Sequence, residues 1–166
     1  EFEIYNYLNP CLNGQSIGLL SDAGCPAIAD PGSEIIRMAH ERKIKIIPLV
    51  GPSSVLLGMM SSGMNGQNFA FNGYLPLNKL DRKLKLKKLE KRSYVERQAQ
   101  IFIETPYRNT NILKELCNIL KPNTELCIAS DLTLPSEKIY TKQICDWKNY
   151  KIELNKKPTI FIIQKN

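Results

Sequence analysis

The first segment that could bind a ligand is the loop Ser21–Gly32. It is rich in Gly, Pro and Asp and follows the apolar run Ile17–Leu20. The Asp22 carboxylate could accept hydrogen bonds from ligand hydroxyl or amino groups, and Gly24 would let the backbone approach a ligand closely. The alternative is a plain strand-to-helix turn, in which Asp22 and Asp30 bond only nearby amides. Taken alone, the loop favours the plain turn.

Two serines, Ser53 and Ser54, follow a Gly-Pro turn at the predicted N-terminus of a helix. Free amides and hydroxyls at such a position can hold a carboxylate. Capping of the helix is the more frequent use of such serines, so both interpretations stay open.

A third stretch reads Glu-Thr-Pro-Tyr-Arg from Glu104 to Arg108. Glu104 and Arg108 could form a polar pair. In the alternative, Thr105 caps a helix that starts at the following proline, and Arg108 lies on the surface. The two interpretations of Arg108 are about equally supported.

The cysteines and the single histidine do not form a metal-site pattern. Five cysteines are scattered without a Cys-x-x-Cys pair, which indicates neither a zinc site nor a disulfide framework. No Ser-His-Asp grouping supports a hydrolase. Scattered free cysteines are typical of a reducing cytosol, and neither a secretory signal nor a membrane-spanning run is visible.

The first part of the chain alternates strands and helices, which predicts a parallel sheet with right-handed crossovers. The predicted elements are a strand over Ser16–Leu20, a helix from Ser33, a strand over Ile44–Val50 and a helix over Val55–Ser62. Small and polar residues at 63–68 read as a linker. We therefore expect one domain over residues 1–66 and a second over residues 67–166.

The second part is also α/β, but its late strands follow one another closely, so antiparallel pairing and a mixed sheet are expected. The predicted helices are Asn78–Arg97 and Tyr107–Leu120, and the predicted strands are Ala99–Glu104, Glu125–Ala129, Lys138–Lys142 and Thr159–Gln164.

A formal net charge of +7 and a pI near 9.2 favour an anionic partner. The predicted helix at 78–97 is dense in Lys and Arg. Lys79, Arg82 and Lys83 at its start could follow the phosphates of a nucleic acid. The alternative, a solvated basic face, is slightly favoured by the helix taken alone.

Several ordered motifs resemble the tetrapyrrole-methylase superfamily of S-adenosylmethionine-dependent methyltransferases. They are Asp-Ala-Gly-x-Pro-x-x-x-Asp-Pro-Gly from Asp22, Val-Gly-Pro-Ser-Ser from Val50, Gly-Tyr-Leu-Pro from Gly73, and the Glu104–Arg108 stretch. The branch most similar is that of the 16S ribosomal RNA cytidine 2′-O-methyltransferases. The resemblance implies a two-domain α/β fold with a partial parallel sheet in the first domain.

The resemblance also implies S-adenosyl-L-methionine as the cofactor and assigns roles to residues. The implied cofactor-binding residues are Asp22, Ala23, Gly24, Cys25, Ile28, Ser53, Ser54, Thr105, Ala129, Pro158 and Thr159. Glu104 and Arg108 are the catalytic candidates on the acceptor side. No metal or nucleophilic triad is needed, because methyl transfer requires mainly alignment of donor and acceptor.

By the same resemblance, the substrate is a ribose 2′-hydroxyl of ribosomal RNA in the small subunit, and the enzyme is a cytoplasmic homodimer without a membrane or metal partner. Two alternatives are a methyltransferase for a small, tetrapyrrole-like molecule and a non-catalytic RNA-binding relative. Substrate affinity that falls steeply with salt would favour RNA.

The chain departs from the resembled branch in three places. A Gly-rich first strand is not seen, so we expect the chain to be a fragment of a longer protein. Ala129–Leu134 reads Ala-Ser-Asp-Leu-Thr-Leu where the branch has Ala-Arg-Glu-Leu-Thr-Lys. Lys157-Pro158-Thr159 replaces a Gly-Glu turn before the closing strand.

Overall fold

The computed structural model describes residues 4–166, which fall into two compact units. The N-terminal unit ends at Ser53, and the C-terminal unit runs from Ser54 to Asn166. Helix α3 (Ser54–Ser62) belongs to the second unit, because it packs on the sheet there. The domain boundary expected after residue 66 stays a prediction.

The described residues of the N-terminal unit form three helical elements, and the first and third of them enclose a small apolar core. The three elements are η1 (Ile4–Leu8), α1 (Asn9–Leu12) and α2 (Ser33–Glu41). Leu8, Met38 and Ala39 are buried together, with Ile35 and Ile44 packed against them. The amphipathic pattern of the predicted helix from Ser33 is thus realised, since its apolar side faces this core.

Two strands predicted for this unit are wrong. Its described residues contain no strand, and Ser16–Leu20 and Ile44–Val50 form no ladder with any other segment. Leu20 and Leu49 are 90% and 87% exposed. Their apolar composition suits a strand, but a strand persists only where a neighbour pairs with its N–H and C=O groups. The parallel sheet expected here is therefore not formed within the described residues.

The C-terminal unit contains a five-stranded mixed sheet, as expected. Its strands are β1 (Phe69–Tyr74), β2 (Ala99–Ile103), β3 (Glu125–Ser130), β4 (Lys138–Gln143) and β5 (Thr159–Gln164). They lie in the order β1-β2-β5-β3-β4. Strand β1 is parallel to β2, whereas β5 is antiparallel to β2 and β3, and β4 is antiparallel to β3. Strands β1, β2 and β3 therefore end at the same edge where β4 and β5 begin.

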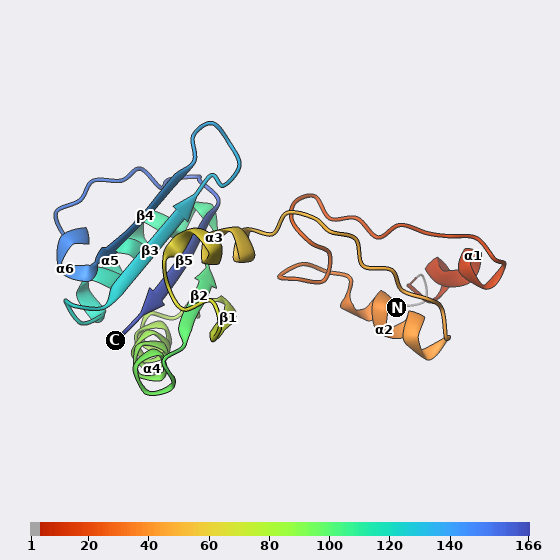
Figure 1. Cartoon of the computed structure of the whole chain (residues 1–166), viewed down its shortest axis with the longest axis horizontal. Coiled ribbons are helices and arrows are strands. Elements are labelled where there is room, and N and C mark those ends of the chain that lie inside the picture. The colour runs from red at the N-terminus through yellow and green to blue at the C-terminus, as the bar shows by residue number, and fades with distance from the viewer. Residues whose placement is uncertain (1–3) are drawn as a thin grey trace. The chain divides into compact units, whose positions relative to one another are not determined.

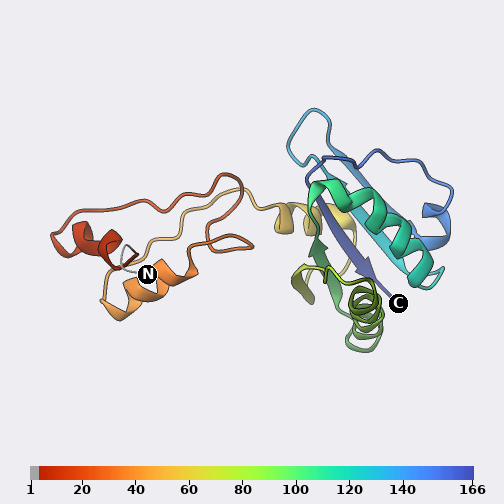
Figure 2. The same ribbon diagram turned by 180° about the vertical axis from the view of Figure 1, so that it is seen from behind.

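Helices cover both faces of this sheet (Figures 1 and 2). Besides α3, the helical elements of the C-terminal unit are α4 (Lys79–Glu96), η2 (Pro106–Arg108), α5 (Asn109–Ile119) and α6 (Ile144–Trp147). Helix α3 packs on one face with Ile160 and Ile162 of β5, while α4 and α5 pack on the other with Phe161 and Ile163. Because β5 is buried on both faces, its central residues 160–163 form an unbroken apolar run.

Helix α4 confirms the helix predicted over this basic segment. The Asn78 side chain caps it by accepting hydrogen bonds from the backbone N–H groups of Leu80 (2.8 Å) and Asp81 (3.3 Å). Leu86 and Leu89 are buried against the sheet. No helix among the described residues is long and apolar enough to cross a membrane.

Gly58 sets how closely α3 can approach the sheet. A Cβ atom at this position would lie 3.1 Å from Ile160 Cγ2. We expect Gly58→Leu to lower the free energy of unfolding by about 1–3 kcal/mol, because overpacking forces the core to shift. Urea unfolding checks this. Gly66→Leu is the control, since nothing lies within 4 Å of a Cβ there, and equal losses from both variants would contradict the prediction.

Candidate functional site

In the N-terminal unit, the loop 21–32 lies against the turn that precedes α3. The Cys25 thiol donates to the carbonyl oxygens of Pro52 at 3.5 Å and Gly51 at 3.9 Å. Asp22, Ala23 and Gly24 are exposed, as is Ile28. The structure thus brings together two of the segments to which the resemblance assigned cofactor contacts.

The backbone of this loop is strained. Ala27 and Ala29 have φ angles of 66° and 58°, a left-handed region that costs a residue with a Cβ roughly 1–2 kcal/mol. The hydrogen bond from Ala27 N to Pro31 O, at 3.2 Å, closes the turn. Strain of this kind gathers at ligand sites, which supports the ligand-binding interpretation of the loop over the plain turn.

In the C-terminal unit, polar residues gather at the sheet edge where β2 and β3 end and β5 begins. We call this set the polar edge; it comprises Glu104, Arg108, Asn109, Ser130, Asp131, Lys157 and Thr159. The strand register aligns it, since Ile103 pairs with Ile160 and Ser130 pairs with Thr159. The Asn109 amide nitrogen donates to Lys157 O at 2.7 Å and ties α5 to the same edge.

The polar edge holds buried polar atoms that have no hydrogen-bond partner. Among the described residues these are Glu104 Oε2, Arg108 Nη1, Asn109 Oδ1 and Ser130 Oγ. Glu104 Oε2 still forms an ion pair with Arg108, which leaves three unpaired atoms. An unpaired buried polar group costs about 1–3 kcal/mol, so three in one place need a reason. A polar ligand that pairs with them would remove that cost.

The Glu104 carboxylate is held at both of its oxygen atoms. Its Oε1 atom accepts the Thr105 N–H at 2.9 Å, and its Oε2 atom lies 3.4 Å from Arg108 Nη2. The Glu104 side chain is only 2% exposed, and that of Arg108 is 28% exposed. The carboxylate therefore keeps an acceptor atom beside a guanidinium group, as expected for the predicted polar pair.

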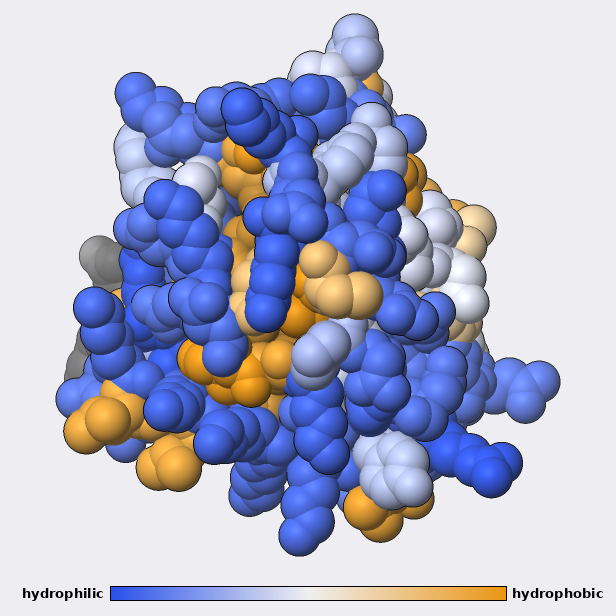
Figure 3. All heavy atoms as spheres, turned by 90° about the vertical axis from the view of Figure 1, so that its left-hand side faces the viewer, coloured by the Kyte–Doolittle hydropathy of each residue, from blue (hydrophilic) through white to orange (hydrophobic). Residues whose placement is uncertain are grey.

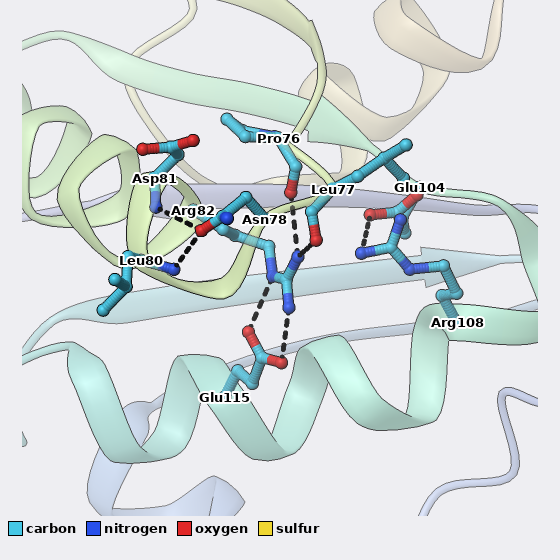
Figure 4. A network of polar contacts seen from close by, with 9 residues as sticks. All are labelled: Pro76, Leu77, Asn78, Leu80, Asp81, Arg82, Glu104, Arg108 and Glu115. Atoms are coloured by element: carbon cyan, nitrogen blue, oxygen red, sulfur yellow. Dashed lines mark hydrogen bonds and ion pairs between the residues drawn. The ribbon is translucent and has the colours of Figure 1, made fainter.

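Arg82 is not placed to bind phosphate, which corrects one assignment in the expected RNA-binding set. It is buried, and its guanidinium group donates to both carboxylate oxygens of Glu115 at 2.7 Å and to the carbonyls of Pro76 and Leu77 (Figure 4). These four bonds join α4, α5 and the turn after β1. Lys79 and Lys83 are exposed.

Two of the chain's departures from the resembled branch contact each other. Lys157 Nζ lies 2.6 Å from Asp131 Oδ2, which also accepts the Ser136 hydroxyl at 2.8 Å. These contacts hold the pKa of the Asp131 carboxyl below its usual value, with the Lys157 bond the largest cause. The turns after β3 and before β5 are also joined through the backbone, from Asp131 N to Pro158 O at 3.0 Å.

The remaining predicted residues lie in different surroundings. Thr105 lies after the end of β2 and Pro158 lies just before the start of β5, and both are exposed. Ala129 is buried under α3. Sequence reasoning missed Asn109 and Ser130, since an Asn at a helix start reads as a cap and a strand-end Ser carries no signal of its own. No group of three or more His, Cys, Asp or Glu side chains among the described residues could hold a metal ion.

The Arg82–Glu115 ion pair should make the free energy of unfolding depend on pH in the acid range. Arg82 holds the pKa of Glu115 below the ordinary value of 4.5, chiefly through the side-chain hydrogen bonds. A depressed pKa stabilises the fold above the unfolded-state value and loses that contribution as the pH falls toward the folded-state value. We expect Glu115→Gln to destabilise the protein by roughly 3 kcal/mol at pH 7 and to flatten the fall in stability below about pH 4.5.

Urea unfolding at several pH values measures both effects. The control is Glu96→Gln, because Glu96 forms a half-exposed pair with Arg92 at 3.1 Å, a kind worth at most about 1 kcal/mol. An unchanged acid profile in Glu115→Gln would contradict the prediction.

No protein-family model matches the chain. Proteins named ribosomal RNA small subunit methyltransferase I are similar to it: that of Vibrio cholerae is 36% identical over 128 residues, and that of Buchnera aphidicola from Schizaphis graminum is 34% identical over 159 residues. These alignments cover 77% and 94% of this chain, but 43% and 54% of the relatives. The chain thus spans about half the length of the curated relatives it matches.

Solved structures share the fold. The methyltransferase CobJ aligns with a TM-score of 0.62 at 16% identity over 95% of this chain and 68% of its own. Uroporphyrin-III C-methyl transferase from Thermus thermophilus, in complex with S-adenosylhomocysteine, aligns with a TM-score of 0.57 at 15% identity over 99% of this chain and 73% of its own. The resemblance drawn from the motifs is therefore confirmed as a similarity: the chain is similar in sequence to proteins named ribosomal RNA small subunit methyltransferase I, and it shares its fold with CobJ and with uroporphyrin-III C-methyl transferase.

Proposed function

We propose that this chain is part of an S-adenosylmethionine-dependent methyltransferase that modifies a ribose 2′-hydroxyl of small-subunit ribosomal RNA. The observation that carries the proposal is its similarity to relatives of that name, which reaches 34% identity over 94% of the chain. The specific ribose acceptor comes from the resemblance to the cytidine 2′-O-methyltransferase branch.

We assign cofactor contacts to residues of each unit separately. In the N-terminal unit, Asp22 would accept from hydroxyl or amino groups, and the left-handed Gly24 (φ 83°) would admit the ligand to the backbone, since no atom lies within 4 Å of a Cβ there. Ser53, which is buried just before α3, and Ser54, the first residue of that helix, would bind a carboxylate. In the C-terminal unit, Thr105, Ala129, Pro158 and Thr159 line the same end of the sheet.

The unpartnered atoms of the polar edge fit a polar ligand, and this supports the proposed site. A sulfonium cofactor supplies a methyl group by in-line displacement: the acceptor oxygen bonds the methyl carbon, the carbon–sulfur bond breaks, and the sulfur keeps that electron pair. Glu104 Oε2 would accept the proton of the acceptor hydroxyl. Arg108 would orient Glu104, and the buried setting would exclude water.

A smaller acceptor is the second candidate. Structural neighbours of the chain include enzymes of tetrapyrrole chemistry, among them cobalt precorrin-4 methyltransferase, which aligns with a TM-score of 0.60. Their identity of 14–16% speaks for the fold alone, whereas the ribosomal RNA relatives are 34–36% identical. The net charge of +7 also favours a polyanionic substrate.

Affinity for RNA would come in part from Lys79 and Lys83 on exposed positions of α4. A homodimer and a cytoplasmic location, both implied by the resemblance, complete the proposal. Light scattering on the purified gene product tests the dimer.

Titration of S-adenosylhomocysteine into the product of the complete gene tests the cofactor site. We expect stoichiometric binding that Asp22→Ala and Ser53→Ala each weaken at least about tenfold, or about 1.4 kcal/mol, because each removes a polar contact to the ligand. Asp81→Ala and Ser61→Ala are the controls, since both residues are exposed and outside the proposed site. Absence of binding to well-folded protein would refute the proposal.

A further inference from the structure

A groove on the C-terminal unit lies apart from the residues assigned above. It has a volume of about 870 Å³ and runs between the outer face of α5 and the segment from Trp147 to Glu153. Figure 3 looks onto the side of this unit that carries α5 and α6, with apolar atoms in a hollow between hydrophilic side chains. Its volume falls in the range of ligand sites.

The charge of the groove has one predominant sign. Four lysines line it, namely Lys114, Lys138, Lys148 and Lys151, against the single carboxylate of Glu153. None of these five residues has a salt bridge within 4.0 Å among the described residues. Clustered lysines without bound carboxylates favour a ligand with several negative charges.

The floor of the groove is apolar and aromatic. Leu113, Cys117 and Ile152 line it together with the half-buried Tyr150. The Tyr150 ring is fixed, because it packs edge-on against Trp147 and Tyr140 with centroids 5.4 Å apart in each pair. Lys142 Nζ lies over the Tyr150 ring, 4.5 Å from its centroid. An apolar and aromatic surface framed by lysines is suited to nucleobases whose phosphates point to the rim.

We infer that this groove binds a single-stranded segment of RNA, with phosphates on the lysines and bases over the apolar floor. The inference deepens the proposed function and rests on it for the identity of the polyanion. It adds a contact surface on the α5 side of the sheet to the lysines of α4.

The test measures binding of a fluorescein-labelled single-stranded RNA of about 12 nucleotides to the product of the complete gene, without methyl donor, at several salt concentrations. Lys148→Gln/Lys151→Gln should weaken binding at least tenfold at low salt. If two phosphate contacts are lost, the slope of log affinity against log salt should fall by about 1.4. Glutamine keeps the side-chain length, so folding should be retained, and circular dichroism checks this.

Lys43→Gln/Lys45→Gln is the matched control, because it removes the same charge from exposed positions of the N-terminal unit. Equal losses in both double variants, or no loss in the groove variant, would overturn the inference. So would a polyglutamate peptide that competes with the RNA at equal charge concentration, since the groove would then fit an acidic protein. Cofactor titration reports separately on the proposed function: a groove effect in a protein that binds no S-adenosylhomocysteine would support RNA binding and reject methyl transfer.

Discussion

Strand β5 is the constraint on which the C-terminal unit depends. It pairs antiparallel with both β2 and β3, and its side chains are buried on both faces of the sheet. This pairing fixes the direction of its neighbours, so the ends of β2 and β3 meet the start of β5. Glu104, Ser130 and Thr159 are distant in sequence, yet they reach one edge through that register.

The second half of the fold was predictable because its signals are local and its partners lie within the chain. Apolar runs at 99–104 and 159–164 became strands, and the basic segment at 78–97 became helix α4. The same reasoning failed for Ser16–Leu20 and Ile44–Val50, because strand formation depends on a pairing neighbour that composition does not reveal. The Asp22 and Glu104 motifs were found by type and spacing, whereas Asn109 and Ser130 became candidates only because one buried polar atom of each has no hydrogen-bond partner.

Some charged residues of the C-terminal unit form structural ion pairs and others do not, and the sequence alone does not distinguish the two groups. Arg82 belongs to a run of basic residues, but its fork geometry matches the Glu115 carboxylate and fixes α4 to α5. Asp131 and Lys157 look like separate losses of the resembled pattern and instead form one ion pair across two turns. The lysines around the groove form no salt bridge within 4.0 Å among the described residues, and the inferred RNA contact rests on them. Charged residues held in such ion pairs are less available to bind a ligand, so the pairs reduce the set of candidate binding residues.

The function that we propose for the protein is methyl transfer to a ribose of small-subunit ribosomal RNA. The most direct measurement incubates the complete gene product with tritiated S-adenosylmethionine and small ribosomal subunits from cells that lack the gene, then locates the label by resistance to alkaline cleavage. We expect label at a ribose of the RNA, and we expect Glu104→Gln to lose this label although that variant still binds S-adenosylhomocysteine. Unlabelled RNA, or label on a base or on a tetrapyrrole supplied in its place, would contradict the proposal.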